Sequence, residues 1–277
     1  MTQASATKAG VTRVWRAIAT GVLLAAPAYF AVVLIAQRPL VFPAPEVPAG
    51  ASRPHDALQV WLNSAAGRTE AWYLPPLKGG SGATPLIIYF HGNAELIDLL
   101  PSEFDVPRGW GMGVLLVEFP GYGRSSGAPS EVAISAVALA AYDWLPTHTS
   151  IDPKRVVAFG RSLGGATAVM LAVERPTAAL ILESTFASLR GIVAGFGVPG
   201  FAALDPFDSV ARIGSYAGPV LVLHGVQDEL IPVNDGRLLA RTARRGEFHT
   251  IPGGHNDCVR PWSVVRRFLE KNGVLSM

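Results

Sequence analysis

Short apolar runs of strand length recur along this 277-residue chain and alternate with stretches of helical character. The apolar runs are Leu86–Phe90, Val114–Phe119, Val156–Phe159, Ala179–Leu182 and Val220–Leu223, with a weaker one at Glu247–Ile251. The helical stretches are Glu131–Trp144, Leu163–Val173, Asp235–Arg244 and Pro261–Lys271. Continuous apolar strands that alternate with helices predict an α/β fold, with a mostly parallel central sheet and helices on both faces.

This pattern occupies one stretch of chain, without an internal repeat or a second core, and it opens with a hairpin around Asn63 and Gly67. Five prolines fall between residues 37 and 56 and favour an extended, semi-rigid linker there. We therefore expect an N-terminal tail at 1–16, an apolar segment at 17–36, a proline-rich linker at 37–56 and one globular domain at 57–277.

The apolar segment, Ala17–Ala36, holds twenty residues without a charge. A helix of that length rises about 30 Å, the thickness of the hydrocarbon core of a bilayer. Lys8, Arg13 and Arg16 precede it, which favours a single-pass transmembrane anchor with a cytoplasmic N-terminus and an extracytoplasmic domain, periplasmic in a bacterium. The alternative is a cleaved signal peptide with its cleavage site at Ala26-Pro27-Ala28, although cleavage there leaves an apolar segment on the mature chain.

Charge and cysteine content narrow the range of partners. The formal net charge is only +2, and no basic stripe interleaved with aromatic residues occurs, so nothing favours a nucleic-acid partner. The single cysteine, Cys258, excludes an internal disulfide and a metal site built from several cysteines. The sequence leaves the oligomeric state open.

Two segments fit the G-x-S-x-G pattern of a nucleophile elbow, Gly160–Gly164 and Gly123–Gly127. The elbow needs a strand that runs straight into the serine and a helix that leaves it at once. Ser162 has both. Ser125 has neither, because a turn separates it from the preceding strand and Pro129 would fall inside the first turns of any helix beginning there. The sequence therefore predicts Ser162 as a nucleophile.

A serine hydroxyl needs a base to take its proton and a carboxylate to orient that base. In chains with this elbow the order is serine, acid, histidine, and both partners lie in loops that follow strands. Of the six histidines, His255 is the one in a loop just past the last strand. Asp228 follows a buried strand and is the expected acid, with Glu183 as the alternative; Asp257 is expected to help fix the His255 loop.

The loop after the first long central strand, Phe90-His-Gly-Asn-Ala, is the expected source of oxyanion donors. An oxyanion hole here combines a backbone N–H of this loop with that of Leu163, the residue after the nucleophile. We expect Asn93 to supply the first donor, with Ala94 as the alternative. His91 and His224 end strands and precede glycine, and we expect them to pack or to shape loops.

Six segments arrive in the same order as in a known family: YFHGNA (89–94), EFPGYGRSSG (118–127), GRSLGG (160–165), LESTFASL (182–189), HGVQDELIP (224–232) and GGHND (253–257). From about residue 57 to the end the chain resembles the alpha/beta-hydrolase superfamily, and within it the membrane-tethered serine hydrolases with a His-Gly-Asn oxyanion loop. The resemblance implies an alpha/beta-hydrolase fold and no metal or organic cofactor. The chain departs from relatives with bulky lids at residues 185–210, where its stretch is short; we expect this stretch to act as a short lid or to pack over the sheet.

The same resemblance implies hydrolysis of a small-molecule or lipid acyl ester or thioester through an acyl-serine intermediate. In that reaction Ser162 attacks, His255 acts as base and then acid, Asp228 orients His255, and Asn93 with Leu163 stabilises the oxyanion. Two other readings stay open. The same three residues can serve a serine peptidase, and the fold alone can serve as a non-catalytic, membrane-tethered scaffold.

Overall fold

The computed structural model describes residues 3–78, 83–145, 150–195 and 197–276 of the chain. It divides into two units, Met1–Val41 and Phe42–Met277. The first is one helix, α1 (Gln3–Val41), which includes Pro27 and Pro39 and so continues through the first five residues of the expected linker. Within the described part of the chain, no helix combines the length and the apolar character that a membrane span requires, so the transmembrane helix expected at 17–36 has no support from the structure.

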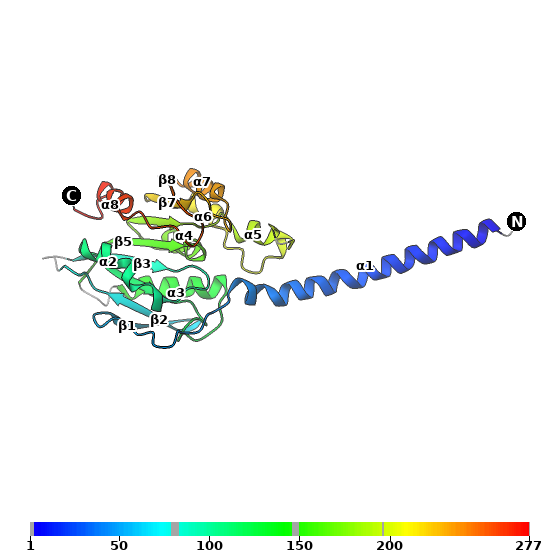
Figure 1. Cartoon of the computed structure of the whole chain (residues 1–277), viewed down its shortest axis with the longest axis horizontal. Coiled ribbons are helices and arrows are strands. Elements are labelled where there is room, and N and C mark those ends of the chain that lie inside the picture. Colours follow the sequence, from blue (N-terminus) through cyan, green and yellow to red (C-terminus); the bar gives the residue numbers. More distant parts are fainter. Residues whose placement is uncertain (1–2, 79–82, 146–149, 196, 277) are drawn as a thin grey trace. The chain divides into compact units, whose positions relative to one another are not determined.

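The second unit is built on a single eight-stranded sheet with the order β1-β2-β4-β3-β5-β6-β7-β8. The strands are β1 (Leu58–Ser64), β2 (Gly67–Leu74), β3 (Thr84–Phe90), β4 (Gly113–Val117), β5 (Ile151–Arg161), β6 (Ala179–Glu183), β7 (Val220–Gly225) and β8 (Gly246–Ile251). β2 pairs antiparallel with β1 and with β4, and every other neighbouring pair is parallel. Figure 1 shows the strands rising from the β1–β2 hairpin at one edge to β7 and β8 at the other. The predicted mostly parallel sheet is confirmed.

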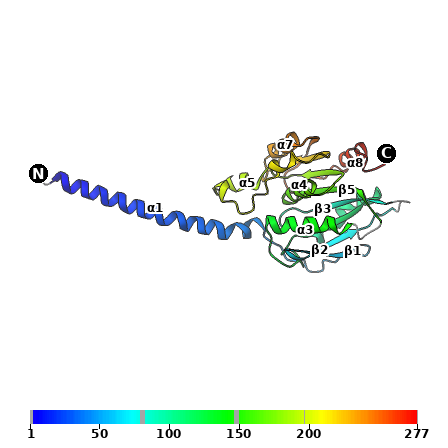
Figure 2. The same ribbon diagram turned by 180° about the vertical axis from the view of Figure 1, so that it is seen from behind.

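Helices cover both faces of this sheet. They are α2 (Asp105–Gly109), α3 (Glu131–Asp143), α4 (Leu163–Glu174), α5 (Leu189–Gly195), α6 (Ser209–Ile213), α7 (Val233–Thr242) and α8 (Trp262–Lys271), with 3-10 turns at Ile97–Leu99, Pro101–Phe104 and Gly200–Ala202. α2 and α8 contact each other on one face. On the other face α4 contacts α3 and α6, and α6 contacts α7; Figure 2 gives the view from behind. The segment expected to act as a short lid contains α5 and the turn at Gly200–Ala202.

The central strands are buried on both faces, which explains their unbroken apolar sequences. In β3, Ile87 and Tyr89 belong to the core on the α2–α8 side, and the residues that alternate with them, Leu86, Ile88 and Phe90, are equally inaccessible. The Tyr89 ring meets Phe104 and Phe159 edge to face, with centroid distances of 4.6 and 5.3 Å. Such close-packed aromatic contacts fix the strands, and therefore also the loops at their carboxyl ends.

Candidate active site

Ser162 occupies a sharp turn between β5 and α4. Its backbone has φ +51° and ψ −119°, a conformation that costs an L-residue about 1–3 kcal/mol and persists only where the surroundings enforce it. Three hydrogen bonds do so. The Ser162 N–H donates to the Glu183 carbonyl at 2.9 Å, and the Ser162 carbonyl accepts from the Thr185 hydroxyl at 2.6 Å and the Gly165 N–H at 3.0 Å. The turn therefore has one fixed geometry, in which the serine is 8% exposed.

The glycines around Ser162 are required by close backbone approaches. A Cβ added at Gly160 would lie 2.0 Å from the Gly164 carbonyl oxygen, and one at Gly164 would lie 2.0 Å from the Phe90 carbonyl oxygen. At Gly165 it would lie 2.4 Å from the Thr185 hydroxyl oxygen. The glycines of G-x-S-x-G-G thus let α4 start directly against β3 and β5.

The structure brings Ser162, Asp228 and His255 together. His255 Nε2 lies 3.1 Å from Ser162 Oγ, and Nδ1 lies 2.8 Å from Asp228 Oδ2. With its proton on Nδ1 donated to the carboxylate, the imidazole presents the Nε2 lone pair to the serine hydroxyl. His255 is 6% exposed and the Asp228 side chain is fully buried, so both contacts are shielded from water.

Four groups hold the Asp228 carboxylate. Oδ1 accepts the backbone N–H groups of Leu230 and Ile231, at 3.0 and 2.8 Å. Oδ2 accepts from His255 and also lies 3.3 Å from Nε2 of His224, which lies 3.0 Å from the Ile231 carbonyl oxygen. Burial lowers the pKa of His224, which favours the neutral imidazole. Nε2 is then its donor, because that nitrogen faces the Ile231 carbonyl oxygen and Asp228 Oδ2. His224 therefore packs against the acid as well as shaping the loop.

The expected oxyanion donors lie on the two segments adjoining Ser162. Leu163 is the first residue of α4, so its N–H belongs to the first turn, which has no partner within the helix, and the helix dipole favours negative charge there. Asn93 Oδ1 accepts the Tyr122 hydroxyl at 2.9 Å and the Ala94 N–H at 3.1 Å. The Ala94 N–H is thus engaged by the Asn93 side chain.

Other candidate residues have structural partners. The Ser125 hydroxyl accepts the Glu70 N–H of β2 at 3.1 Å, which fastens its loop to the sheet. The Glu183 carboxylate, the alternative acid, is paired with Arg260. Asp257 accepts the Gly254 N–H at 2.5 Å, as expected for a residue that fixes the His255 loop.

Three residues that contact the loops of the site were not predicted from the sequence: Tyr122, Arg161 and Glu95. Tyr122 follows β4 in a Pro-Gly-Tyr-Gly turn and is fully buried, and burial raises the pKa of its phenol. Arg161 directly precedes Ser162, and its guanidinium pairs with Glu95 of the loop after β3. The adjacency of Arg161 to the nucleophile was the one available signal, because its partners lie far away in the sequence.

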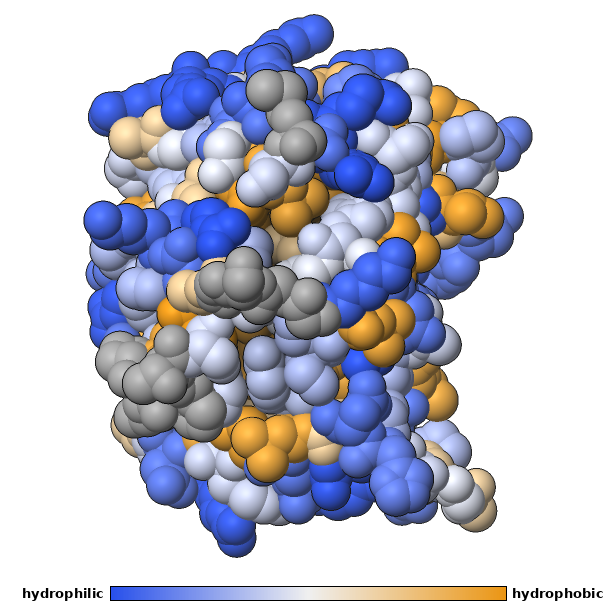
Figure 3. All heavy atoms as spheres, turned by 90° about the vertical axis from the view of Figure 1, so that its left-hand side faces the viewer, coloured by the Kyte–Doolittle hydropathy of each residue, from blue (hydrophilic) through white to orange (hydrophobic). Residues whose placement is uncertain are grey.

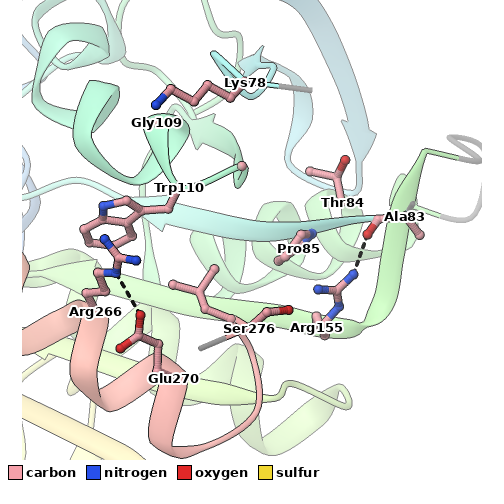
Figure 4. Close-up of a pocket in the computed structure, with 12 residues that line it drawn as sticks. Lys78, Ala83, Thr84, Pro85, Gly109, Trp110, Arg155, Arg266, Glu270 and Ser276 are labelled. Atoms are coloured by element: carbon pink, nitrogen blue, oxygen red, sulfur yellow. Dashed lines mark hydrogen bonds and ion pairs between the residues drawn. The ribbon is translucent and has the colours of Figure 1, made fainter. Parts of the chain in front are cut away.

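A cavity of about 370 Å³ lies at the opposite, amino ends of the strands. It is lined by Thr84 and Pro85 at the start of β3, and by Trp110, Arg155 and Arg266 among others (Figure 4). Its arginines are committed to Glu270, Asp152 and the Ala83 carbonyl, and no histidine lines it. Figure 3 views this end of the domain, whose surface is largely hydrophilic with separate apolar patches. Across the described residues, no cluster of three or more histidine, cysteine or acidic side chains could hold a metal ion.

Solved structures of low sequence identity share this fold. Thermogutta terrifontis esterase 2, in a form phosphoramylated by tabun, superposes with a TM-score of 0.64 and 18% identity over 82% of this chain and 98% of its own. A puromycin-hydrolysing peptidase of Mycobacterium tuberculosis superposes with a TM-score of 0.65 and 19% identity, over 80% of this chain and 39% of its own. The fold of this chain is thus shared by an esterase and by a peptidase.

Other relatives share more of the sequence than these solved structures do. A protein of Mycobacterium tuberculosis described as uncharacterised is 39% identical over 219 residues, covering 75% of this chain and 77% of its own. The alpha/beta hydrolase domain-containing protein WAV2 of Arabidopsis thaliana is 32% identical over 248 residues, covering 76% and 78%. No family model matches the chain. On the strength of these relatives and of the fold, the chain belongs to the alpha/beta hydrolase family.

Proposed function

We propose that this chain is a serine hydrolase that cleaves ester or thioester bonds through an acyl-enzyme intermediate. One observation carries the proposal: a single buried imidazole, His255, lies within hydrogen-bond distance of both Ser162 Oγ and Asp228 Oδ2. A nucleophile, its base and an orienting carboxylate in that sequence of contacts are the elements of acyl transfer.

In the first half of the reaction, Ser162 Oγ attacks the carbonyl carbon of the substrate while His255 Nε2 takes the hydroxyl proton. Asp228 stabilises the imidazolium that forms. The oxyanion receives the backbone N–H groups of Leu163 and Asn93, and collapse of the intermediate passes the proton from His255 to the leaving alcohol or thiol. In the second half, water gives a proton to His255 Nε2 and attacks the acyl carbon. The bond from that carbon to Ser162 Oγ then breaks, His255 returns the proton to Oγ, and the acid is released.

The acyl chemistry and membership of the family support the proposed substrate class. A small-molecule or lipid acyl ester or thioester needs only the nucleophile, the base and the oxyanion donors. Each of these has a candidate residue in the site, and the proposed reaction uses no metal or organic cofactor.

The test is covalent labelling by a fluorophosphonate probe, which reacts with activated serines. Wild-type protein and Ser125→Ala should be labelled, and Ser162→Ala should not. Ser125 is a matched control because it stands in the same pentapeptide pattern but bonds to β2. Labelling of Ser162→Ala equal to that of wild type refutes the assignment.

A second measurement separates esterase, peptidase and scaffold. Purified protein is assayed with p-nitrophenyl esters of increasing acyl length and with aminoacyl p-nitroanilides. Ser162-dependent ester turnover supports the proposal, and turnover mainly of the anilides would favour a peptidase, a reading suggested by the fold match to the puromycin-hydrolysing enzyme. Absence of both turnover and labelling would favour a scaffold.

We also propose that residues 17–36 attach the protein to a membrane, with the catalytic domain outside the cytoplasm. The support for this is the uncharged sequence alone. It is tested by extracting membranes of cells that express the full chain with alkaline carbonate. Retention in the pellet supports an anchor. Release into the supernatant argues against one, and protease accessibility in intact cells then reports the orientation of a retained domain.

A further inference from the structure

Arg161 is the last residue of β5 and stands directly before the proposed nucleophile. Its side chain is only 13% exposed, although the guanidinium points away from the hydrophobic core and into the loops around Ser162. Nη1 forms an ion pair with Glu95 Oε1, and Nη2 donates to the His255 carbonyl oxygen at 2.6 Å and to Asn256 Oδ1 at 3.0 Å. One planar group therefore joins the loops that follow β3, β5 and β8.

Glu95 extends this connection to the expected oxyanion loop. While Oε1 pairs with Arg161, Oε2 accepts the N–H of Gly92 at 2.7 Å, one residue before Asn93. A Cβ added at Gly92 would lie 3.2 Å from Arg161 Nη1 and 3.3 Å from the Glu95 carboxylate, so the loop backbone lies directly against the ion pair. The Arg161–Glu95 pair thus sets where this backbone sits.

We propose that Arg161 is a positioning residue, which holds the His255 main chain and the Gly92–Asn93 backbone at fixed places around Ser162. The inference rests on the hydrolase function proposed above and adds to it a residue that acts through both the base and an oxyanion donor. Its physical basis is the guanidinium fork, whose donors have fixed relative directions, so that holding one loop fixes the other. Loss of that rigidity misplaces catalytic groups, and a shift of about 1 Å can lower a rate on the order of 10²-fold.

A second buried arginine shows by contrast what a purely structural role looks like. Arg260 also pairs with Glu183, but its guanidinium lies over the core rings of Phe104, Phe159 and Trp262 rather than against the loops of the site. Arg161 Nε is 3.9 Å from Glu183, so that pair adds little to its binding. The close contacts of Arg161 are concentrated on the loops that carry the chemistry.

The test compares Arg161→Lys with Arg175→Lys in the full chain. Arg175 forms a two-point pair with Asp143, both contacts at 2.9 Å, on an exposed surface, and serves as the matched control. Lysine keeps the charge but can direct its single ammonium toward only one loop. We measure kcat and KM with a p-nitrophenyl ester, the rate of fluorophosphonate labelling, and the thermal midpoint.

For Arg161→Lys we expect kcat to fall on the order of 10²-fold, with KM and the thermal midpoint little changed and labelling of Ser162 slowed but complete. Guanidinium ion at millimolar concentration should partly restore the kcat of Arg161→Ala, more than ammonium at equal ionic strength. Glu95→Gln should lower kcat in the same way, and its effect should not multiply with that of Arg161→Lys, because the two act as one unit.

Wild-type kcat in Arg161→Lys would overturn the positioning role, and so would a loss of kcat that merely tracks a lowered thermal midpoint. In either case Ser162-dependent turnover by the wild type leaves the hydrolase function standing. A wild-type protein with neither turnover nor labelling overturns both proposals. A fall in kcat of Arg175→Lys equal to that of Arg161→Lys would show that the effect is not specific to the site.

Discussion

The ion pair between Arg260 and Glu183 offers a sharp test of what holds the domain together. Arg260 Nε lies 2.5 Å from Glu183 Oε2, and the two side chains are only 7% and 4% exposed. We consider Arg260→Met, which keeps an unbranched apolar stem and removes the charge. The Glu183 carboxylate is then left buried, with the Arg161 guanidinium 3.9 Å away as its remaining cation.

Removing one partner of a buried pair costs about 3–5 kcal/mol, because the remaining charge has lost both water and counter-charge. For a domain of this size such a loss lowers the thermal midpoint by roughly 6–20 °C. The second substitution, Glu183→Gln, removes the stranded charge. We therefore expect Arg260→Met/Glu183→Gln to recover most of the loss and to lie within about 1–2 kcal/mol of wild type, the remainder reflecting lost hydrogen bonds and ring contacts.

The measurement is urea unfolding of wild type, both single variants and the double variant, followed by tryptophan fluorescence and circular dichroism. Equal slopes with denaturant show that the compared states are the same, so that midpoints report stability. The reasoning is refuted if the double variant is no more stable than Arg260→Met. In that case the arginine would stabilise through packing against the aromatic rings and not by neutralising Glu183.

Three further outcomes follow from individual contacts. Ser125→Ala should lose about 1 kcal/mol in urea unfolding, since its hydroxyl accepts the Glu70 N–H at 3.1 Å, and ester turnover should stay at the wild-type level. The free energy of unfolding of Gly164→Ala should fall by about 3 kcal/mol or more, because the new Cβ would lie 2.0 Å from a carbonyl oxygen. Gly191→Ala is the control: a Cβ there meets nothing within 4 Å, so this variant should melt at or above the wild-type temperature. Burial raises the pKa of Cys258 to about 11, so its alkylation by iodoacetamide should be slow at pH 8 and should accelerate about tenfold per pH unit below that value. The pKa of this thiol is higher in the folded protein than in the unfolded chain, where it is about 8.5. Its contribution to stability is therefore present below pH 8.5 and is lost as the pH rises toward 11. Alkylation at pH 8 at the rate of a free thiol would contradict the raised pKa.

The central parallel strands β3, β4, β6 and β7 could be read from the sequence because burial on both faces gives each of them a continuous apolar run. The expected run Ala179–Leu182 and the observed β6 (Ala179–Glu183) differ by one residue. The short helices α2, α5 and α6, with five to seven residues each, were not predicted, since so few turns carry no readable period.

In the site, too, only residues with a readable local pattern could be predicted from the sequence. Ser162, Asp228 and His255 could be nominated because each follows a strand whose carboxyl end is predictable. The ion pair of Arg161 with Glu95 spans 66 residues, and nothing local in either segment indicates the partner. The sequence likewise does not indicate that Ala94 has a φ of +59° or that its N–H donates to the Asn93 side chain, because both depend on the folded loop.

The imidazole that bridges Ser162 and Asp228 comes from the loop after β8, and the serine lies 93 residues earlier in the chain. A ribosome therefore completes the elbow long before it completes the base. Until β8 has paired with β7 and the His255 carbonyl has met Arg161, the nascent chain carries the proposed nucleophile without its proposed base. A chain that stops before β8 therefore contains the proposed nucleophile without its proposed base.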